Sequence, residues 1–351
     1  MRYKLLGRSG LRVSEMALGT MTFGTDWGWG ADREESRRIF DAYVAAGGNF
    51  IDTANRYTFG TSERFVGEFI EGDRDRFVVA TKFTITHPHM QGDPNAGGSH
   101  RKSLMFNLRR SMERLGVDHV DLLWVHMWDR MTPVEETLRA LDDVVRAGMV
   151  HHVGWSDAPA WVVSRANAIA ECRGWTRFNA LQLRYSLVER TPERELMPMA
   201  RELDLAVTPW AILGAGVLTG KYTREGGTTG TERLLVEEDR ARASLTERNL
   251  AIAREVDAVA AEVGCTPSQA AIAWLRSRPG VIVPILGARS LEQVQENLGA
   301  LEVDLSPGHL ARLDEVSAIE MGFPTDFLES PFVRDLMYGG LFDDIDDHRP
   351  H

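Results

Sequence analysis

The chain alternates short apolar runs with longer amphipathic stretches from about residue 15 to residue 300. The short runs are hydrophobic on both faces, which is typical of parallel strands that are covered by helices. The longer stretches place apolar residues three and four positions apart, which predicts helices that bury one face. The expected strands are Glu15–Leu18, Phe50–Asp52, Phe77–Thr81, Val120–Val125, Val150–Gly154, Ala180–Leu183, Ala206–Trp210 and Val281–Leu286. The expected helices between them are Glu34–Ala46, Ser62–Glu71, His100–Leu115, Pro133–Ala147, Pro159–Cys172, Arg194–Glu202 and Leu291–Ala300.

Eight strand and helix units are what a closed (β/α)8 TIM barrel requires. A doubly wound open sheet fits the alternation almost as well, so the dinucleotide-binding motif of such sheets decides between them. No G-x-G-x-x-G follows the first strand, because Arg33 stands where the third glycine after Gly28 and Gly30 is needed. A P-loop is also missing, since the run from Gly216 to Lys221 is one residue short. The sequence therefore predicts the α/β TIM barrel.

Several segments extend a minimal barrel. The turn at Gly7–Gly10 predicts an N-terminal hairpin that closes the barrel bottom. Long polar loops at Thr86–Ser99 and Thr219–Glu247 follow strands and belong to the active-site face. The second loop leads into two expected helices, and a further helix and a tail follow the last unit. We predict one domain over residues 1–351, with a core at about 15–300 and a C-terminal helix and tail at 301–351. These added helices and the tail are Leu250–Val263, Pro267–Arg276, Pro307–Ile319 and Met321–His351.

Composition narrows the class of function. The 351 residues carry a formal net charge of -11, which disfavours nucleic-acid binding because phosphate contacts need basic patches. No apolar stretch suits a secretory signal or a membrane span. Cys172 and Cys265 lie far apart inside helical patterns, which argues against a disulfide framework. We expect a cytoplasmic enzyme that acts on a small molecule, with a homo-oligomer possible and no nucleic-acid or membrane partner.

Ionisable side chains stand at the ends of three consecutive expected strands. Asp52 ends one strand and Tyr57 follows in the loop, Lys82 closes the next strand, and His126 closes the third. An ammonium beside a phenol stabilises the phenolate, so we expect Lys82 to lower the tyrosine pKa from its usual value near 10. Asp52 can hold the lysine in place and charged, and His126 can hydrogen-bond a carbonyl oxygen. Each of these residues alone is common in a structural role, but the joint placement of all four predicts a proton-transfer site.

Three motifs carry a family resemblance. The segment Asp52-Thr53-Ala54-Asn55-Arg56-Tyr57 resembles the D-T-A-x-x-Y segment of the aldo-keto reductases, a (β/α)8 family that uses NAD(P)H. Ala80-Thr81-Lys82 resembles the lysine strand of that family, and the run from Asp121 to His126 resembles its histidine strand. The resemblance runs from the first strand to the last helix. It implies that Tyr57 is the proton donor and that Asp52, Lys82 and His126 support it.

The same resemblance implies a cofactor site. Trp210 is expected to stack on the nicotinamide, while Ser156, Asp157 and Gln182 hold the carboxamide. Asp157 stands where the family commonly has asparagine, so it can only accept a hydrogen bond when ionised. Arg289 can pair with a 2′-phosphate, which favours NADPH over NADH. The remaining expected contacts are Ala211, Leu213, Gly216, Leu218 and Lys221 around the pyrophosphate and Gly287, Gln293, Glu296 and Asn297 around the adenosine.

Two other classes of function compete with this interpretation. His87 and His89, or His151 and His152, suggest a metal-dependent barrel hydrolase, but His87 and His89 lack an evident third ligand on a strand end, and we expect no metal. The beta subunits of voltage-gated potassium channels share the fold and act as partners, so the tail could be an interaction arm. The intact set of four residues favours catalysis. We predict an NADPH-dependent oxidoreductase that reduces aldehydes or ketones to alcohols.

Overall fold

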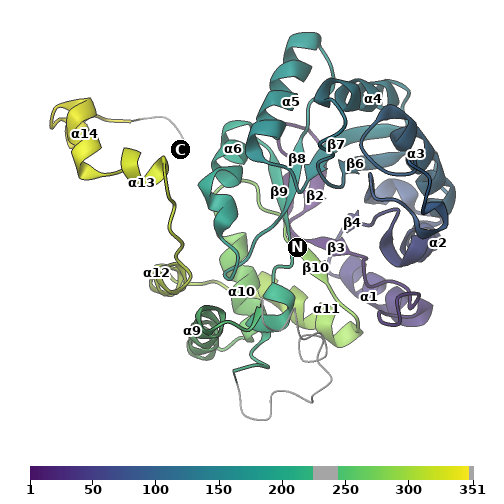
Figure 1. Cartoon of the computed structure of the whole chain (residues 1–351). Helices are drawn as coiled ribbons and strands as arrows, with labels where there is room; N and C mark the ends of the chain where they lie inside the picture. Colours follow the sequence, from purple (N-terminus) through teal and green to yellow (C-terminus); the bar gives the residue numbers. More distant parts are fainter. Residues whose placement is uncertain (224–243, 348–351) are drawn as a thin grey trace.

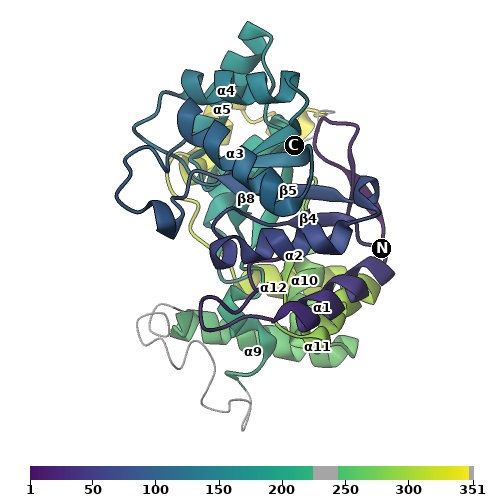
Figure 2. The same ribbon diagram turned by 90° about the vertical axis from the view of Figure 1, so that its right-hand side faces the viewer.

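The computed structural model describes residues 1–223 and 244–347. Eight parallel strands form a nearly closed barrel, with helices around the outside (Figures 1 and 2). The expected TIM barrel is confirmed. Neighbouring strands follow the order β10-β3-β4-β5-β6-β7-β8-β9. These strands are β3 (Ala17–Gly19), β4 (Phe50–Asp52), β5 (Val78–Phe83), β6 (Val120–Val125), β7 (Val150–Ser156), β8 (Ala180–Arg184), β9 (Ala206–Trp210) and β10 (Ile285–Gly287).

The last strand closes the barrel in two steps. Its second half, β10, pairs in parallel with β3, with Ile285 beside Ala17. The residues before it hydrogen-bond to β9 instead. The Val207 N–H donates to the Val281 carbonyl at 2.7 Å, and the Val283 N–H donates to the Val207 carbonyl at 2.8 Å. The apolar run at residues 281–286, which was expected to form one strand, therefore bonds to β9 in its first half and to β3 in its second half. It joins the two edges of the sheet.

The helices cover the outer face of the strands in sequence order. Two of them, α9 and α10, follow β9, as the sequence analysis expected. Most of the loop expected at Thr219–Glu247 lies outside the described residues. The helices of the barrel are α1 (Arg33–Ala45), α2 (Thr61–Ile70), α3 (Arg101–Leu115), α4 (Val134–Arg146), α5 (Ala160–Arg173), α6 (Leu196–Glu202), α9 (Glu247–Val263), α10 (Pro267–Arg276) and α11 (Leu291–Leu298).

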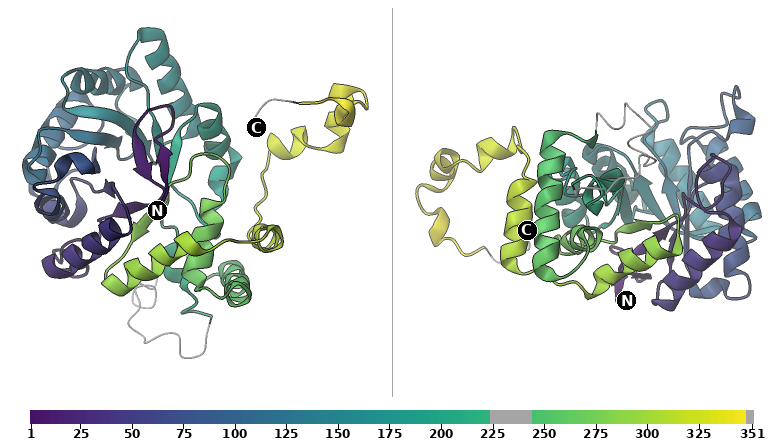
Figure 3. Two further views of the ribbon diagram at one scale, coloured as in Figure 1. Left: turned by 180° about the vertical axis from the view of Figure 1, so that it is seen from behind. Right: turned by 90° about the horizontal axis from the view of Figure 1, so that it is seen from below.

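Apolar side chains fill the barrel as well as the layer between strands and helices. Phe50, Leu122 and Trp124 lie in the interior cluster and are fully buried. Gly154 makes room for the indole of Trp124, because a Cβ at that position would lie 2.3 Å from the ring. The hairpin β1 (Tyr3–Leu5) and β2 (Arg12–Ser14) adds residues to the same cluster and lies across the barrel (Figure 3, left). The expected hairpin therefore closes the barrel bottom.

The chain after the barrel forms an extended arm. Helix α12 (Pro307–Val316) packs on α9, where Arg312 donates to Glu255 at 2.7 Å. The tail, residues 321–347, holds α13 (Thr325–Leu328), α14 (Pro331–Tyr338) and the short turn η7 (Phe342–Asp344). It projects to the side of the barrel (Figure 1; Figure 3, right). Within the described residues, no helix is both long and apolar enough to cross a bilayer.

Candidate active site

Lys82 lies at the centre of the polar cluster at the carboxyl ends of the strands. Its side chain is fully buried on β5, next to Asp52 at the end of β4. The ammonium donates to Oδ2 of Asp52, to the Thr53 carbonyl at 2.9 Å and to the Tyr57 hydroxyl at 3.1 Å. An ammonium has three protons, and these three acceptors use all of them. The three bonds therefore fix the orientation of the Lys82 ammonium, with one N–H directed at the Tyr57 hydroxyl.

Asp52 has a second partner that the sequence analysis missed. The Gln182 side-chain amide donates to Oδ1 of Asp52 at 3.0 Å, from β8 across the barrel. Both carboxylate oxygens are therefore paired, which a buried carboxylate requires. Gln182 was expected only at the carboxamide of the cofactor. The available signal was its position at the carboxyl end of a barrel strand, where inward-facing polar side chains converge.

The protonation states follow from burial and these contacts. Burial alone lowers the pKa of Lys82, but the Asp52 carboxylate and the Tyr57 phenol raise it above its ordinary value. Burial raises the pKa of Tyr57, and the opposing effect of Lys82 only partly offsets it. The expectation that Lys82 brings the tyrosine pKa below its usual value was therefore wrong for this structure. Lys82 is a cation and Tyr57 a protonated phenol across the neutral range.

His126 completes the cluster beyond the end of β6. Its backbone N–H donates to the Phe83 carbonyl at 3.1 Å, and its ring lies edge-on to Tyr57 with centroids 6.1 Å apart. Burial and the Lys82 charge lower the pKa of His126 to about 3, so the imidazole is neutral. Its buried Nδ1 has no hydrogen-bond partner within the described part of the chain. A neutral ring in this position can donate one hydrogen bond to a bound oxygen atom.

The depressed pKa of His126 predicts a pH dependence of stability. The unfolded chain takes up a proton at this residue near pH 6.5, whereas the folded protein does so only near pH 3. Stability is therefore full above pH 6.5 and falls as the pH drops, by at most about 1.4 kcal/mol per pH unit from this group. Urea unfolding of the His126→Gln variant should show a shallower loss than the parent between these pH values. Equal slopes in the two proteins would contradict the assignment.

The turn that presents Tyr57 is strained. Thr58 and Phe59 both have left-handed backbone angles, with φ of 43° and 54°, which side chains with a Cβ rarely adopt. Thr58 is buried, and its hydroxyl donates to the Phe23 carbonyl at 2.6 Å and accepts from the Ser62 N–H at 3.1 Å. These bonds hold Thr58 in place. Strain of this kind is characteristic of functional turns, and here it positions the phenol.

Aromatic side chains extend from this turn. The Trp27 ring lies 6.1 Å from the Phe59 ring and 5.5 Å from the Trp29 ring, measured between centroids. Nε2 of His87 lies 3.0 Å from the Phe59 carbonyl, and the His87 and His89 rings are 4.9 Å apart. In the described residues no third metal-ligating side chain joins this histidine pair. His87 therefore packs as part of the aromatic group beside Tyr57.

The residues expected at the nicotinamide lie next to the cluster. Ser156 ends β7 and is buried, and Asp157 follows with a left-handed φ of 47°. The Trp210 indole N–H donates to Oδ1 of Asp157 at 3.1 Å. Desolvation raises the pKa of the Asp157 carboxylate, and the hydrogen bond from Trp210 opposes this effect. Asp157 therefore orients the Trp210 ring.

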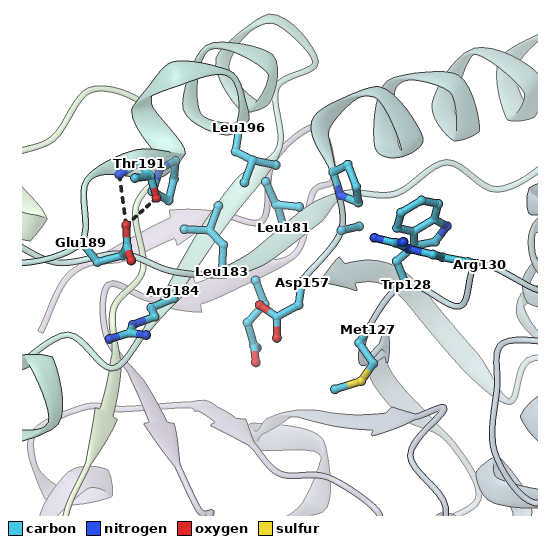
Figure 4. A pocket seen from close by; sticks show the side chains of 14 residues that line it. Met127, Trp128, Arg130, Asp157, Leu181, Leu183, Arg184, Glu189, Thr191 and Leu196 are labelled. Atoms are coloured by element: carbon cyan, nitrogen blue, oxygen red, sulfur yellow. Dashed lines mark hydrogen bonds between the residues drawn. The ribbon is translucent and has the colours of Figure 1, made fainter. Parts of the chain in front are cut away.

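A cavity of about 500 Å³ opens beside these residues. In Figure 4, Asp157 and Met127 lie between Arg184 on one side and Arg130 on the other. The Arg130 guanidinium lies over the Trp128 ring, 5.1 Å from its centroid. The cavity therefore offers apolar surface together with cationic groups. Its other lining residues are Ala158, Pro159, Leu181, Gln182, Leu183, Glu189, Thr191, Pro192 and Leu196.

The loop after β9 has the backbone expected of a phosphate cradle. Ala211 and Gly216 have positive φ angles of 53° and 95°, and the short helix η5 (Gly214–Thr219) lies between Leu213 and Gly220. Lys221 lies over the loop, since a Cβ on Gly216 would come within 2.8 Å of its ammonium. Leu218 is fully buried. The loop can therefore offer amides and a cation, but Leu218 can contribute only through its backbone.

The residues expected at the adenosine surround the start of α11. Ser290 caps the helix by accepting from the Gln293 N–H, and the Gln293 side chain accepts from the Arg289 N–H at 2.9 Å. Arg289 itself is exposed. Asn297 is buried and donates to the Gly287 carbonyl at 3.3 Å, so it braces the loop. Glu296 is partly exposed on the same helix.

Glu35 is a residue that the sequence analysis did not name. Its carboxylate, carried by α1, accepts from the Leu291 N–H at 2.6 Å. This amide is one of the donors at the start of α11 that lack a partner within the helix, close to Arg289, where a 2′-phosphate was expected. Glu35 and Leu291 are 256 residues apart along the chain, so no local pattern could reveal the contact. An anion that binds this helix start competes with Glu35 for the amide.

Comparison with known proteins agrees with the TIM barrel. The Aldo/keto reductase family profile matches residues 15–318, and the chain belongs to this family of oxidoreductases. A norsolorinic acid reductase of Emericella nidulans is 38% identical over 92% of this chain and 83% of its own length. An NADP(+) aryl-alcohol dehydrogenase of Phanerodontia chrysosporium is 35% identical over 90% of this chain and 85% of its own length. A putative aryl-alcohol dehydrogenase of Saccharomyces cerevisiae is 34% identical over 93% and 89%.

The residues on the barrel rim fit a nicotinamide dinucleotide. One end offers the flat Trp210 ring with the polar atoms of Ser156 and Asp157, and the other offers the exposed Arg289 at a helix start. Gly287, two residues before Arg289, has open space where a Cβ would stand. An aromatic face, amide-binding groups and a guanidinium match the nicotinamide, the carboxamide and a 2′-phosphate respectively.

Proposed function

We propose that the protein is an NADPH-dependent reductase that converts the carbonyl group of an aldehyde or ketone to an alcohol. The observation that carries the proposal is the contact of the Lys82 ammonium with both Asp52 and the Tyr57 hydroxyl. This arrangement places a protonated phenol beside a fixed cation at the mouth of the barrel. Bound NADPH supplies the hydride.

The residues of the chain have separate parts in the reaction. The neutral His126 donates a hydrogen bond to the carbonyl oxygen and orients it toward Tyr57. The Tyr57 hydroxyl transfers its proton to that oxygen as negative charge develops there. Lys82 stabilises the resulting phenolate, and Asp52 with Gln182 keeps the ammonium in place. Ser156, Asp157 and Gln182 would hold the carboxamide, with Trp210 against the ring face.

We infer that the substrate carries its carbonyl on an aromatic ring system. Two observations support this class: the names of the aryl-alcohol dehydrogenase relatives, and the group of Trp27, Trp29 and Phe59 beside the Tyr57 turn. Flat aromatic ligands gain stacking energy from such faces. The test is NADPH consumption with matched aromatic and aliphatic aldehydes. Higher kcat/KM for aromatic aldehydes is expected, and a preference for aliphatic ones would overturn the substrate class. No consumption with any carbonyl would favour a regulatory role instead.

Arg289 is expected to select the phosphorylated cofactor. Charge-assisted bonds of a guanidinium to a phosphate are worth about 1.5–3 kcal/mol, and NADH lacks the 2′-phosphate. Arg289→Ala should therefore weaken NADPH binding by about ten- to a hundredfold and leave NADH nearly unchanged. Quenching of tryptophan fluorescence gives both dissociation constants. Equal losses for the two cofactors would assign the Arg289 side chain to support of the loop instead of to the phosphate.

A further inference from the structure

Three metal-ligating side chains meet at the end of the barrel opposite the active site. His119 immediately precedes β6, Asp121 is the second residue of β6, and His151 is the second residue of β7. We call these residues the β6–β7 cluster. They lie at the amino-terminal starts of the strands, whereas Lys82 and His126 lie at the carboxyl ends. The cluster therefore has no part in the carbonyl chemistry.

The register of the sheet fixes the cluster. Val120 pairs with Val150 and Leu122 with His152, so Asp121 and His151 are direct neighbours on adjacent parallel strands. Their side chains leave the same face of the sheet, and His119 is two residues before Asp121 and shares that face. Neighbouring strands are about 4.8 Å apart. Rigid backbone therefore brings two imidazoles and one carboxylate to a single point.

The side-chain geometry agrees with this placement. One candidate ligand atom from each of the three residues lies within 4.8 Å of the other two. The His119 and His151 rings are 4.4 Å apart between centroids, and their planes differ by 30°. Nδ1 of His151 lies 3.6 Å from Oδ1 of Asp121. These distances leave room for an ion between the groups after small side-chain rotations.

The neighbours of Asp121 hold it in a ligand orientation. Its Oδ2 accepts from the Arg74 guanidinium at 2.7 Å and from the Val79 N–H at 2.8 Å. Oδ1 is left facing His151. Partners of this kind, outside the ligand set, orient a ligand and strengthen metal binding. The carboxylate of Asp118 lies 2.6 Å from Nδ1 of His119 and offsets the positive charge of Arg74.

We propose that the β6–β7 cluster binds one Zn²⁺ ion through His119, Asp121 and His151, with water as the fourth ligand. Two imidazoles and one carboxylate are a common set for zinc, with bonds of about 2.0–2.2 Å. The His151 side chain is 49% exposed, which gives the ion a route from solvent. This proposal departs from the sequence expectation of no metal, which considered His151 beside His152 and did not bring His119 and Asp121 to it. Bound zinc would tie β6 to β7 and stabilise the barrel bottom.

The test is zinc titration of the full-length, untagged and metal-stripped protein by isothermal calorimetry and thermal unfolding. We expect one ion per chain. At a zinc concentration of about 100 times Kd, Tm should rise by about 3–4 °C. His119→Gln and His151→Gln should each weaken binding by about 100-fold or more and abolish the Tm shift. Asp121 is left unchanged, because its loss also removes the partner of Arg74.

The matched control is the double variant His87→Gln/His89→Gln, which removes the other adjacent histidine pair of similar spacing. It should bind zinc like the parent. Circular dichroism and Tm without metal show whether each variant is folded. The proposal is overturned if the parent binds no zinc, if binding survives in both cluster variants, or if only the control variant loses it. These readouts do not depend on reductase activity, so they are independent of the proposed function.

Discussion

Tyr57→Phe is expected to lower kcat by about 10²–10⁴-fold, the contribution typical of a positioned proton donor. The change removes one oxygen and its proton, and it leaves the aromatic ring against Lys82, whose ammonium lies 4.7 Å from the ring centroid. None of the cofactor contacts proposed for Trp210, Asp157 or Arg289 involves the phenol. NADPH binding should therefore be nearly unchanged. Steady-state kinetics and a fluorescence titration of NADPH measure the two quantities.

Tyr3→Phe is the matched control for this experiment. Tyr3 lies on the N-terminal hairpin at the barrel bottom, and its hydroxyl donates to the Gly47 carbonyl at 2.9 Å. Its loss should leave kcat unaltered. Turnover of Tyr57→Phe close to that of the parent would remove Tyr57 from the mechanism, and a parallel loss of NADPH affinity would make it a binding residue.

Lys82→Met is expected to have the second-largest effect, because it acts on both stability and rate. Among the described residues, Gln182 is then the one remaining side-chain partner of the buried Asp52 carboxylate. Removing one partner of a buried ion pair costs about 3–5 kcal/mol in the free energy of unfolding. The folded pKa of Lys82 is raised, so the lysine contributes this stability below its unfolded pKa and loses it only as the pH rises through the folded value. The loss should therefore be constant through the neutral range in urea unfolding.

The double variant Asp52→Leu/Lys82→Met separates the two effects. It removes both charges, so much of the stability should return while turnover stays low. In the single variant the apparent pKa of the catalytic acid should rise further, since Lys82 lowers the pKa of Tyr57. A pH–rate profile of unchanged shape, with only NADPH binding weakened, would assign Lys82 to the cofactor. If the double variant is no more stable than Lys82→Met, the loss of stability does not come from the unpaired charge of Asp52.

The fold could be predicted from the sequence because its elements are locally encoded. The apolar run at residues 120–125 has the pattern of a buried strand, and β6 has the same bounds. The sequence did not show that the run at residues 281–286 has two parts, because the two halves differ only in the strand to which they bond, β9 or β3. Which partner a residue takes is decided by closure of the whole barrel. That information is not present in any one segment.

The placement of the four strand-end residues followed from the rule that parallel strands end on one face. The side-chain pairing around them did not. Gln182 contacts Asp52, and Glu35 contacts the start of α11, across 130 and 256 residues. The pKa of Tyr57 was misjudged for a related reason. A neighbouring charge can be inferred from a motif, whereas the degree of burial depends on every element that surrounds the site.

The tail has a consequence for the colloidal behaviour of the protein in concentrated solution. Ten large apolar side chains of this segment are exposed, far more than the surface of a single chain normally presents in one place. Acidic residues are interspersed among them, and they oppose association by like-charge repulsion. Acidification and high salt weaken that repulsion, so storage conditions decide whether the segment stays solvated. The apolar residues are Phe323, Phe327, Leu328, Phe332, Leu336, Met337, Tyr338, Leu341, Phe342 and Ile345.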